Sequence, residues 1–367
     1  MIKLVDLGKQ HKALEVELMT AIEDIVVTSS FIGGTPLANF ESCFADFCSV
    51  NNIIGVSNGT TAIEVALRAN GIGTGDEVIT VAHTFFATAE AILNVGAKPV
   101  FVDVNLVDGL MNISMIEAVL TKKTKAVIPV HLYGHLVNIK KLKEISDKYN
   151  LVIIEDAAQA HGASAAWGKP GQITEAATFS FYPGKNLGAW GDAGAIATNN
   201  EILASRYRKM RDHGRITKYE HSVVGMNARM DALQAEVLRI KLSKLKSWNE
   251  RRHEIALMYV EAITEKGFEI LFQDASYQSA WHLFVVRVAN RELIQNRFKQ
   301  AAIETGIHYP VPLHRQPALQ DMFSGLVLPV TEKLAEEIIS LPLHPYLTDN
   351  EVSQIIDLFL ETAEVVK

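Results

Sequence analysis

Short apolar runs rich in β-branched residues alternate with helical segments over the first 200 residues, and this alternation restricts the possible folds most strongly. The apolar runs lie at 52–57, 77–82, 98–104, 125–132, 151–156, 176–181 and 193–198. Helical patterns lie between several of them, at 60–69, 85–96 and 138–150. The runs show little polar alternation, which is typical of strands buried on both faces of a parallel sheet. We therefore predict an α/β fold with a mostly parallel sheet covered by helices, in which ligands bind beyond the carboxyl ends of the strands.

The pattern changes after about residue 228. A segment beginning RMDALQAEVLRIKL keeps helical periodicity over a length that few globular helices reach, and we expect it to bridge two domains. After it we predict a strand at 281–288 and helices near 291–305, 331–340 and 349–365. These features predict a large domain at 1–244, which includes the N-terminal segment, and a smaller α+β domain at 245–367.

Composition excludes several classes of function. The 35 lysines and arginines against 42 acidic residues give a formal charge of −7 without a basic block, so we expect no nucleic-acid partner. No apolar run has the length of a signal peptide or a membrane span, which predicts a cytoplasmic protein without a membrane partner. Cys43 and Cys48 lie in a predicted helix and are interpreted as reduced, buried core residues. The spacing of His131 and His135 matches no helical zinc motif, and we predict no metal site.

Lys185 is the first candidate for chemistry. It follows the strand at 176–181 in the run TFSFYPGKNLGAWGDAGAI, where a Pro-Gly turn presents a single lysine among several glycines. Glycines allow a backbone to approach a ligand closely. A solvated loop lysine is the alternative, and by itself it is the more common case.

Asp156 is the second candidate, because it ends the buried strand of LVIIEDAAQAHGA. A carboxylate in that position faces the ligand crevice, where it would keep a nearby heterocyclic nitrogen protonated. The alternative is that Asp156 caps the segment that follows it, and the sequence does not separate the two interpretations.

Two further elements follow other strands. In SNGTTAIEVAL, Gly59 and Thr60 open a helix whose free amides would attract a phosphate, although ordinary capped helices begin in the same way. In AHTFFATAEAI, Phe85 could lie against a flat ring, although most phenylalanines only fill a core. Together the four elements supply a phosphate site, a ring cover, a partner for a pyridine nitrogen and an amine, all at carboxyl ends of strands.

These segments resemble the DegT/StrS family of nucleotide-sugar aminotransferases, which have the aspartate-aminotransferase-like fold of type I pyridoxal phosphate (PLP) enzymes. The similarity covers nearly the whole chain. It rests on VSNGTTAIEVAL, VIPVHLYG, VIIEDAAQAHGA, TFSFYPGKNLGAWGDAGAI, RDHGRITKY, GMNARMDALQAEVL and HYPVPLHRQP. Some relatives carry a histidine in place of the lysine and are dehydratases, so the presence of Lys185 favours transamination.

The resemblance implies specific roles, with PLP as the cofactor. Lys185 would form the internal aldimine and move the proton, and Asp156 would pair with the pyridine nitrogen. The other implied cofactor contacts are Gly59, Thr60, Phe85, Gln159, Ser180 and Asn227. Asn227 would reach the phosphate of a partner subunit, which implies a homodimer with shared active sites. The implied substrate contacts are Tyr182, Tyr309 and His314.

The expected reaction moves an amino group from glutamate to a nucleotide-linked keto-6-deoxyhexose, through a pyridoxamine intermediate. The runs KYEHSVVGMNARMD and HYPVPLHRQP resemble relatives that act on thymidine-diphosphate (TDP) 3-keto-6-deoxyhexoses, so we expect amination at C3. Three alternatives stay open: amination of a C4 ketone, PLP-dependent sugar dehydration, and a PLP-binding regulator without catalysis.

Overall fold

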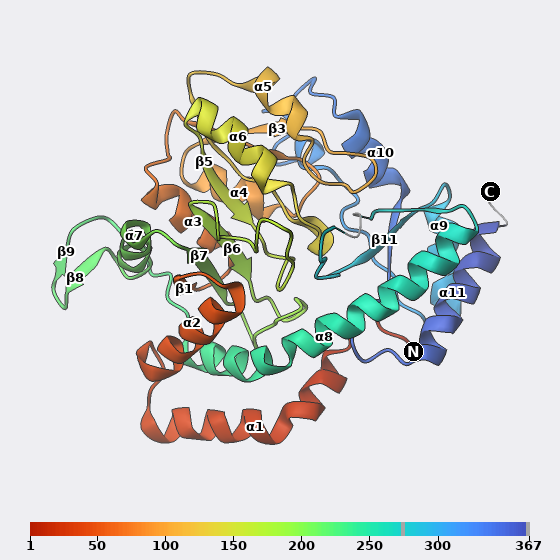
Figure 1. Cartoon of the computed structure of the whole chain (residues 1–367), viewed down its shortest axis with the longest axis horizontal. Helices are drawn as coiled ribbons and strands as arrows, with labels where there is room; N and C mark the ends of the chain where they lie inside the picture. Colours follow the sequence, from red (N-terminus) through yellow and green to blue (C-terminus); the bar gives the residue numbers. More distant parts are fainter. Residues whose placement is uncertain (273–275, 365–367) are drawn as a thin grey trace.

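A computed structural model of the protein describes residues 1–272 and 276–364. A seven-stranded sheet forms the centre of the large domain (Figure 1). Its strands are, in spatial order, β1 (Asn52–Val56), β7 (Gly194–Thr198), β6 (Ala176–Ser180), β5 (Val152–Asp156), β4 (Thr124–Val127), β2 (Glu77–Val81) and β3 (Lys98–Val102). Only β7 runs antiparallel to its neighbours, which confirms the predicted mostly parallel sheet.

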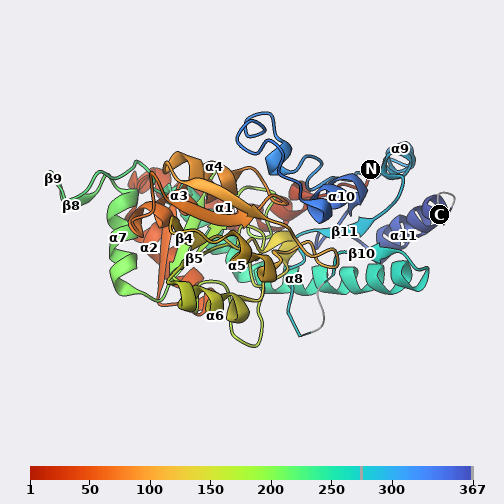
Figure 2. The same ribbon diagram turned by 90° about the horizontal axis from the view of Figure 1, so that it is seen from above.

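The helices of the first 265 residues are α1 (Leu7–Thr28), α2 (Gly34–Cys48), α3 (Gly59–Ala69), α4 (Ala87–Asn94), α5 (Ile116–Val119), α6 (Ile139–Tyr149), α7 (Glu201–Arg211) and α8 (Ala232–Glu265). Most of them cover this sheet, whereas α1 packs on the outside of α8. Short 3-10 turns lie at Ile113–Met115, Leu132–Gly134 and Leu313–Arg315. A small hairpin, β8 (Arg215–Thr217) and β9 (Glu220–His221), extends from one end of the molecule (Figures 1 and 2).

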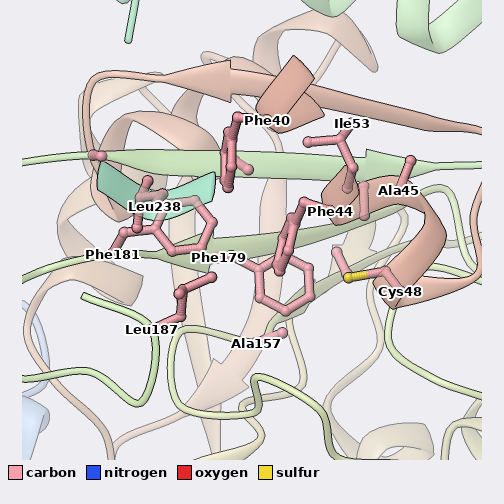
Figure 3. Packing of buried hydrophobic residues seen from close by; sticks show 14 of the residues in the cluster. Phe40, Phe44, Ala45, Cys48, Ile53, Ala157, Phe179, Phe181, Leu187 and Leu238 are labelled. Atoms are coloured by element: carbon pink, nitrogen blue, oxygen red, sulfur yellow. The ribbon is translucent and has the colours of Figure 1, made fainter. Parts of the chain in front are cut away.

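Successive residues of the strands point to opposite faces of the sheet, and each face has its own core. On one face, α2 and α8 pack against β6 and β7, and the ring centroids of Phe44 and Phe179 lie 5.1 Å apart (Figure 3). On the other face, α3, α4 and α7 cover Ile54, Ile154 and Ile196. Each buried aliphatic or aromatic side chain contributes about 1.5–3 kcal/mol, so the two cores hold the carboxyl ends of the strands in fixed positions.

The C-terminal part forms a smaller unit at the far end of α8 (Figure 2). It contains β10 (Glu269–Ile270), α9 (Arg291–Gln300), β11 (Phe284–Arg287), α10 (Pro329–Glu337), β12 (Ile338–Leu341) and α11 (Asp349–Glu364). The three strands form an antiparallel sheet in the order β10-β11-β12. The expected α+β composition is confirmed, and α8 is the long bridging helix. The predicted domain boundary at 244/245 falls inside α8 and stays a prediction.

Several expected elements differ from the structure. Residues 338–340, predicted as the end of a helix, lie in β12, because pairing with β11 overrides the helical pattern. Strand β4 stops at Val127, shortly before Pro129, whose nitrogen has no hydrogen to donate to a ladder. The helix expected at 291–305 ends at Gln300, before Ala302 with its φ of +55°. Residue 365 of the last predicted helix lies outside the described residues.

The two cysteines also differ from each other. Both lie in α2, as predicted, and Cys48 is buried in the core. Cys43 is exposed, so its interpretation as a core residue is wrong. It points away from the sheet because only one face of an amphipathic helix meets the core. No helix among the described residues is long and apolar enough to cross a bilayer.

Candidate active site

A cavity of about 820 Å³ opens at the carboxyl ends of the central strands. This volume is in the range of pockets that hold cofactors and small substrates. The loops after β1, β2, β5 and β6 line it, together with segments of the C-terminal unit. Among the residues predicted from the sequence, it brings together Gly59, Thr60, Phe85, Asp156, Gln159, Ser180, Tyr182, Lys185 and Tyr309.

Lys185 lies in a tight loop directly after β6. The Lys185 N–H donates to the Tyr182 carbonyl at 2.8 Å, and the Ala189 N–H donates to the Phe181 carbonyl at 2.8 Å, which closes the loop. Phe179 and Phe181 are buried in the core below, so the end of β6 is firmly held. Burial lowers the pKa of the Lys185 amine to about 8, and the negative charge of Asp156 partly opposes this shift. A larger share of the amine is therefore neutral and nucleophilic at neutral pH than in an ordinary lysine.

Asp156 ends β5 beside this loop. Its Oδ2 accepts a hydrogen bond from the Thr88 hydroxyl at 2.8 Å, and its Oδ1 accepts from the Ala158 N–H at 3.2 Å. Burial raises the pKa of Asp156, while these hydrogen bonds and the charge of Lys185 counteract the shift. A buried carboxylate of this kind is stabilised when a cation lies against it.

The N-terminus of α3 faces the same cavity. Asn58 caps the helix by accepting the Thr61 N–H at 2.8 Å, and the first amides of a helix have no partner inside it. Gly59 lies against β6 so closely that a Cβ there would come within 2.7 Å of the Ser180 Cβ. The helix end and the Ser180 hydroxyl therefore form a narrow site for an anion.

Aromatic and amide side chains close the remaining wall. Gln159 accepts the Tyr133 N–H at 2.6 Å and donates to the Tyr309 hydroxyl at 3.3 Å. The Phe85 ring is 58% exposed and lies 5.7 Å from the Tyr309 ring. Tyr182 is also largely exposed. Flat, accessible rings at the cavity mouth suit contact with a flat ligand.

Two predicted residues lie elsewhere. His314 is buried and its Nε2 is 2.8 Å from Glu332 Oε1, and it is not among the residues that line the cavity. Asn227 is exposed and pairs through its backbone with Asp212, near the base of the β8–β9 hairpin. Neither residue is among those that line the cavity in the described part of the chain.

Other residues of the site were not predicted from the sequence. Thr88 orients Asp156 from the first turns of α4, and its only sequence signal was a position one helical turn after Thr84. His282 and His308 reach the cavity from the C-terminal unit. Their contribution depends on contacts between segments far apart in the chain. His131 and His135 have structural partners instead, Glu155 and the Leu271 carbonyl.

Comparison with known proteins identifies the family. The model of the DegT/DnrJ/EryC1/StrS aminotransferase family matches residues 12–360. The chain belongs to this family. Its aminotransferase fold and enzymatic class, both expected from the resemblance, are thereby confirmed.

Individual relatives of this aminotransferase cover nearly its whole length. It is 38% identical over 371 residues to a dTDP-3-amino-3,4,6-trideoxy-alpha-D-glucose transaminase of Streptomyces venezuelae, covering 100% of the chain and 97% of the relative. It is 40% identical to a dTDP-3-amino-3,6-dideoxy-alpha-D-galactopyranose transaminase of Aneurinibacillus thermoaerophilus, with coverages of 97% and 98%. A protein of Geobacillus stearothermophilus named as a pleiotropic regulatory protein is 39% identical, covering 98% of each chain.

Two solved structures are similar to this chain over nearly its whole length. The crystal structure of S. venezuelae DesV in complex with a ketimine intermediate superposes with a TM-score of 0.97 at 38% identity, covering 100% of this chain and 99% of DesV. NtdA of Bacillus subtilis, solved with bound pyridoxamine phosphate (PMP), superposes with a TM-score of 0.90 at 32% identity. The superposition covers 95% of this chain and 82% of NtdA.

Aminotransferases of this family depend on PLP, and the cavity fits that cofactor. The narrow anion site at Gly59 and Ser180 suits a phosphate, Asp156 suits a protonated ring nitrogen, and Lys185 supplies an amine of lowered pKa. These are the groups by which PLP enzymes hold and orient their cofactor.

The lowered pKa of Lys185 predicts how PLP capture depends on pH. Only the neutral amine attacks the cofactor aldehyde, so the rate should rise with pH, reach half of its maximum near pH 8 and level off above that pH. Stopped-flow measurement of the visible absorption band, after PLP is mixed with apo protein, checks this. The control is Nα-acetyl-lysine amide, which has a free ε-amine of ordinary pKa, and its rate of reaction with PLP should continue to rise toward about pH 10. A similar continued rise in the protein would contradict the lowered pKa.

Proposed function

We propose that this aminotransferase moves an amino group from glutamate to a keto-6-deoxyhexose carried by a nucleotide, and that its substrate is a TDP-3-keto-6-deoxyhexose. The single observation that supports the chemistry most strongly is the meeting of Lys185, Asp156 and the α3 N-terminus in one cavity. The substrate class rests on two relatives at 38% and 40% identity whose names specify dTDP-linked 3-amino sugars.

PLP, when bound, supplies an electrophilic carbon for amines and a ring that takes up electron density. The chain supplies the other functions. The neutral Nζ of Lys185 would hold the cofactor covalently through that carbon and, once displaced by the amino donor, would take up and return a proton as general base and acid. The Asp156 carboxylate, oriented by Thr88, keeps the ring nitrogen protonated. The amides of Gly59 and Thr60, with the Ser180 hydroxyl, would bind the phosphate.

The remaining predicted residues have roles in recognition. Phe85 would cover one face of the cofactor ring, and Gln159 would bind near the ring hydroxyl. Tyr182 and Tyr309 contact the sugar, and both line the cavity. Substrate binding by His314 stays a prediction from the resemblance, because His314 is not among the residues that line this cavity in the described part of the chain.

We further propose a homodimer in which Asn227 of each subunit reaches the phosphate site of its partner. Support comes from the exposure of Asn227 and from exposed apolar residues in the adjoining hairpin and directly after it. Tyr219 is 83% exposed and Val224 is 95% exposed, and a second subunit would cover them.

The test has two steps. Glutamate added alone to the PLP-loaded protein should convert the visible absorption band to the near-ultraviolet band of the aminated cofactor. The keto sugar and ¹⁵N-glutamate are then supplied, and NMR of the product locates the nitrogen. Nitrogen at C3 supports the proposal and nitrogen at C4 overturns the keto position. Loss of a sugar oxygen without stoichiometric use of glutamate would identify a dehydratase.

A second candidate is a PLP-binding regulator, favoured by the G. stearothermophilus relative named as a regulatory protein. That function requires the fold and cofactor without turnover. A visible band that persists unchanged with every amino donor tested would favour it, whereas conversion by glutamate excludes a purely non-catalytic role.

A further inference from the structure

His282 lines the cavity but has no role in the mechanism above. It belongs to the segment before β11 and is 9% exposed. Its Nδ1 lies 3.0 Å from Oδ1 of Asn186, the residue next to Lys185. The identity of the atom that donates in this contact decides whether the other ring nitrogen, Nε2, is a donor or an acceptor.

The orientation of the Asn186 amide follows from its other contacts. Its Nδ2 donates to the Ala280 carbonyl at 2.7 Å and to Asn249 Oδ1 at 3.0 Å. A backbone carbonyl only accepts hydrogen bonds, so the atom facing Ala280 is the amide nitrogen. Asn249 is oriented in the same way, since its Nδ2 donates to the His161 carbonyl at 2.7 Å. The atom of Asn186 that faces His282 is therefore the oxygen.

An oxygen at that position accepts, so Nδ1 of His282 carries a hydrogen and donates it. Burial is the main cause that lowers the pKa of His282 well below its ordinary value, and the positive charge of Lys185 adds to the shift. The ring is then neutral with one hydrogen, located on Nδ1, and Nε2 holds a free lone pair. No hydrogen bond from the described residues to this Nε2 is present.

We infer that Asn186 is a positioning residue that holds His282 in the Nδ1–H tautomer, so that His282 Nε2 accepts a hydrogen bond from an O–H or N–H group of the bound substrate. The same amide attaches the residue after Lys185 to α8 and to the segment before β11. One side chain thus couples the placement of the lysine to the state of the histidine. The tautomer does not depend on the substrate, whereas the contact with a substrate hydroxyl or amine rests on the proposed function.

The first experiment reads the tautomer directly. Solid-state ¹⁵N NMR of the full-length PLP-loaded protein, labelled at the histidine ring nitrogens, distinguishes Nδ1–H from Nε2–H, and the His282→Gln spectrum identifies the signal that is lost. We expect Nδ1–H and an unprotonated Nε2 at neutral pH. In Asn186→Leu the constraint is removed, and the Nε2–H form should gain population. An Nε2–H or doubly protonated ring in the unsubstituted protein would overturn the inference.

A matched pair of variants tests the role of the lone pair. Asparagine at 282 places its amide nitrogen near the Nδ1 position and keeps a donor for Asn186, but it lacks the acceptor. His282→Asn should therefore keep the visible PLP band and the melting temperature, while kcat/KM for the keto sugar falls about tenfold or more. His282→Gln restores an acceptor near the Nε2 position and should recover part of that loss.

A His282→Asn variant with unchanged kcat/KM for the keto sugar would refute the contact with the substrate, whatever the tautomer. If the unsubstituted protein does not turn over keto sugars, the proposed function fails, and the NMR result still decides the tautomer. The two failures are therefore distinguishable.

Discussion

Replacement of Lys185 by alanine is expected to lower kcat by more than about 10⁴-fold, because it removes both the nucleophile that captures the cofactor and the base that moves the proton. The visible absorption band of lysine-bound PLP should be absent from the variant. Steady-state turnover with glutamate and the keto sugar, together with the absorbance spectrum, measures both effects.

Two controls separate this effect from a loss of folding. Lys185→Arg keeps a cation but lacks a nucleophilic amine, and it should be as inactive as the alanine variant. Lys140→Ala changes an exposed lysine of α6 and should leave turnover unchanged. Turnover retained in Lys185→Ala would refute the mechanism, since no other lysine is among the residues that line the cavity in the described part of the chain.

The second large effect is expected for Asp156→Asn. Asparagine has nearly the same shape and keeps an oxygen for the Thr88 hydroxyl, but it cannot hold a proton on a ring nitrogen through opposite charge. Loss of one fixed electrostatic contact of this kind costs about 10²–10³ in rate. We expect a loss of that order in kcat, measured with both substrates at saturation.

Stability provides an independent readout for the same variant. Burial raises the pKa of Asp156, so the folded apo protein holds this proton more tightly than the unfolded chain does. Above that pKa the ionised carboxylate lowers stability, and this cost decreases as the pH falls. Asp156→Asn removes the cost and should leave the apo melting temperature at pH 7 unchanged or higher. A large drop in melting temperature together with the loss of rate would indicate a structural role instead.

Thr88→Val is the graded control. It removes one hydrogen bond to Asp156 and keeps the charge, so its loss of kcat should be far smaller than that of Asp156→Asn. Equal losses in the two variants would show that orientation of the carboxylate, and not its charge, limits the rate.

Local patterns were sufficient to predict the strands and the residues that follow them. Lys185, Asp156, Gly59 and Phe85 each follow or end a recognisable buried strand, and parallel strands bring their carboxyl ends to one edge. The sequence also predicted the long helix α8, because its periodicity continues without a helix breaker. The predicted end of α10 was wrong, because residues 338–340 pair with β11 and form a strand, and this long-range pairing has no local signal.

The histidines and hydrogen-bond partners of the site could not be predicted in the same way. His282 and His308 lack a local signal, and Thr88 has only its position one helical turn after Thr84. The places of all three depend on packing between α4, the central strands and the C-terminal unit. The sequence by itself determined the class of fold and the order of the strands along the chain, and it predicted the amine and carboxylate of the candidate site. Only the tertiary structure decided the orientation of Asp156, the lowered pKa of Lys185 and the tautomer of His282. The physical reason is that strands and loops follow from short-range periodicity, whereas burial and hydrogen-bond orientation arise when segments distant in the chain meet.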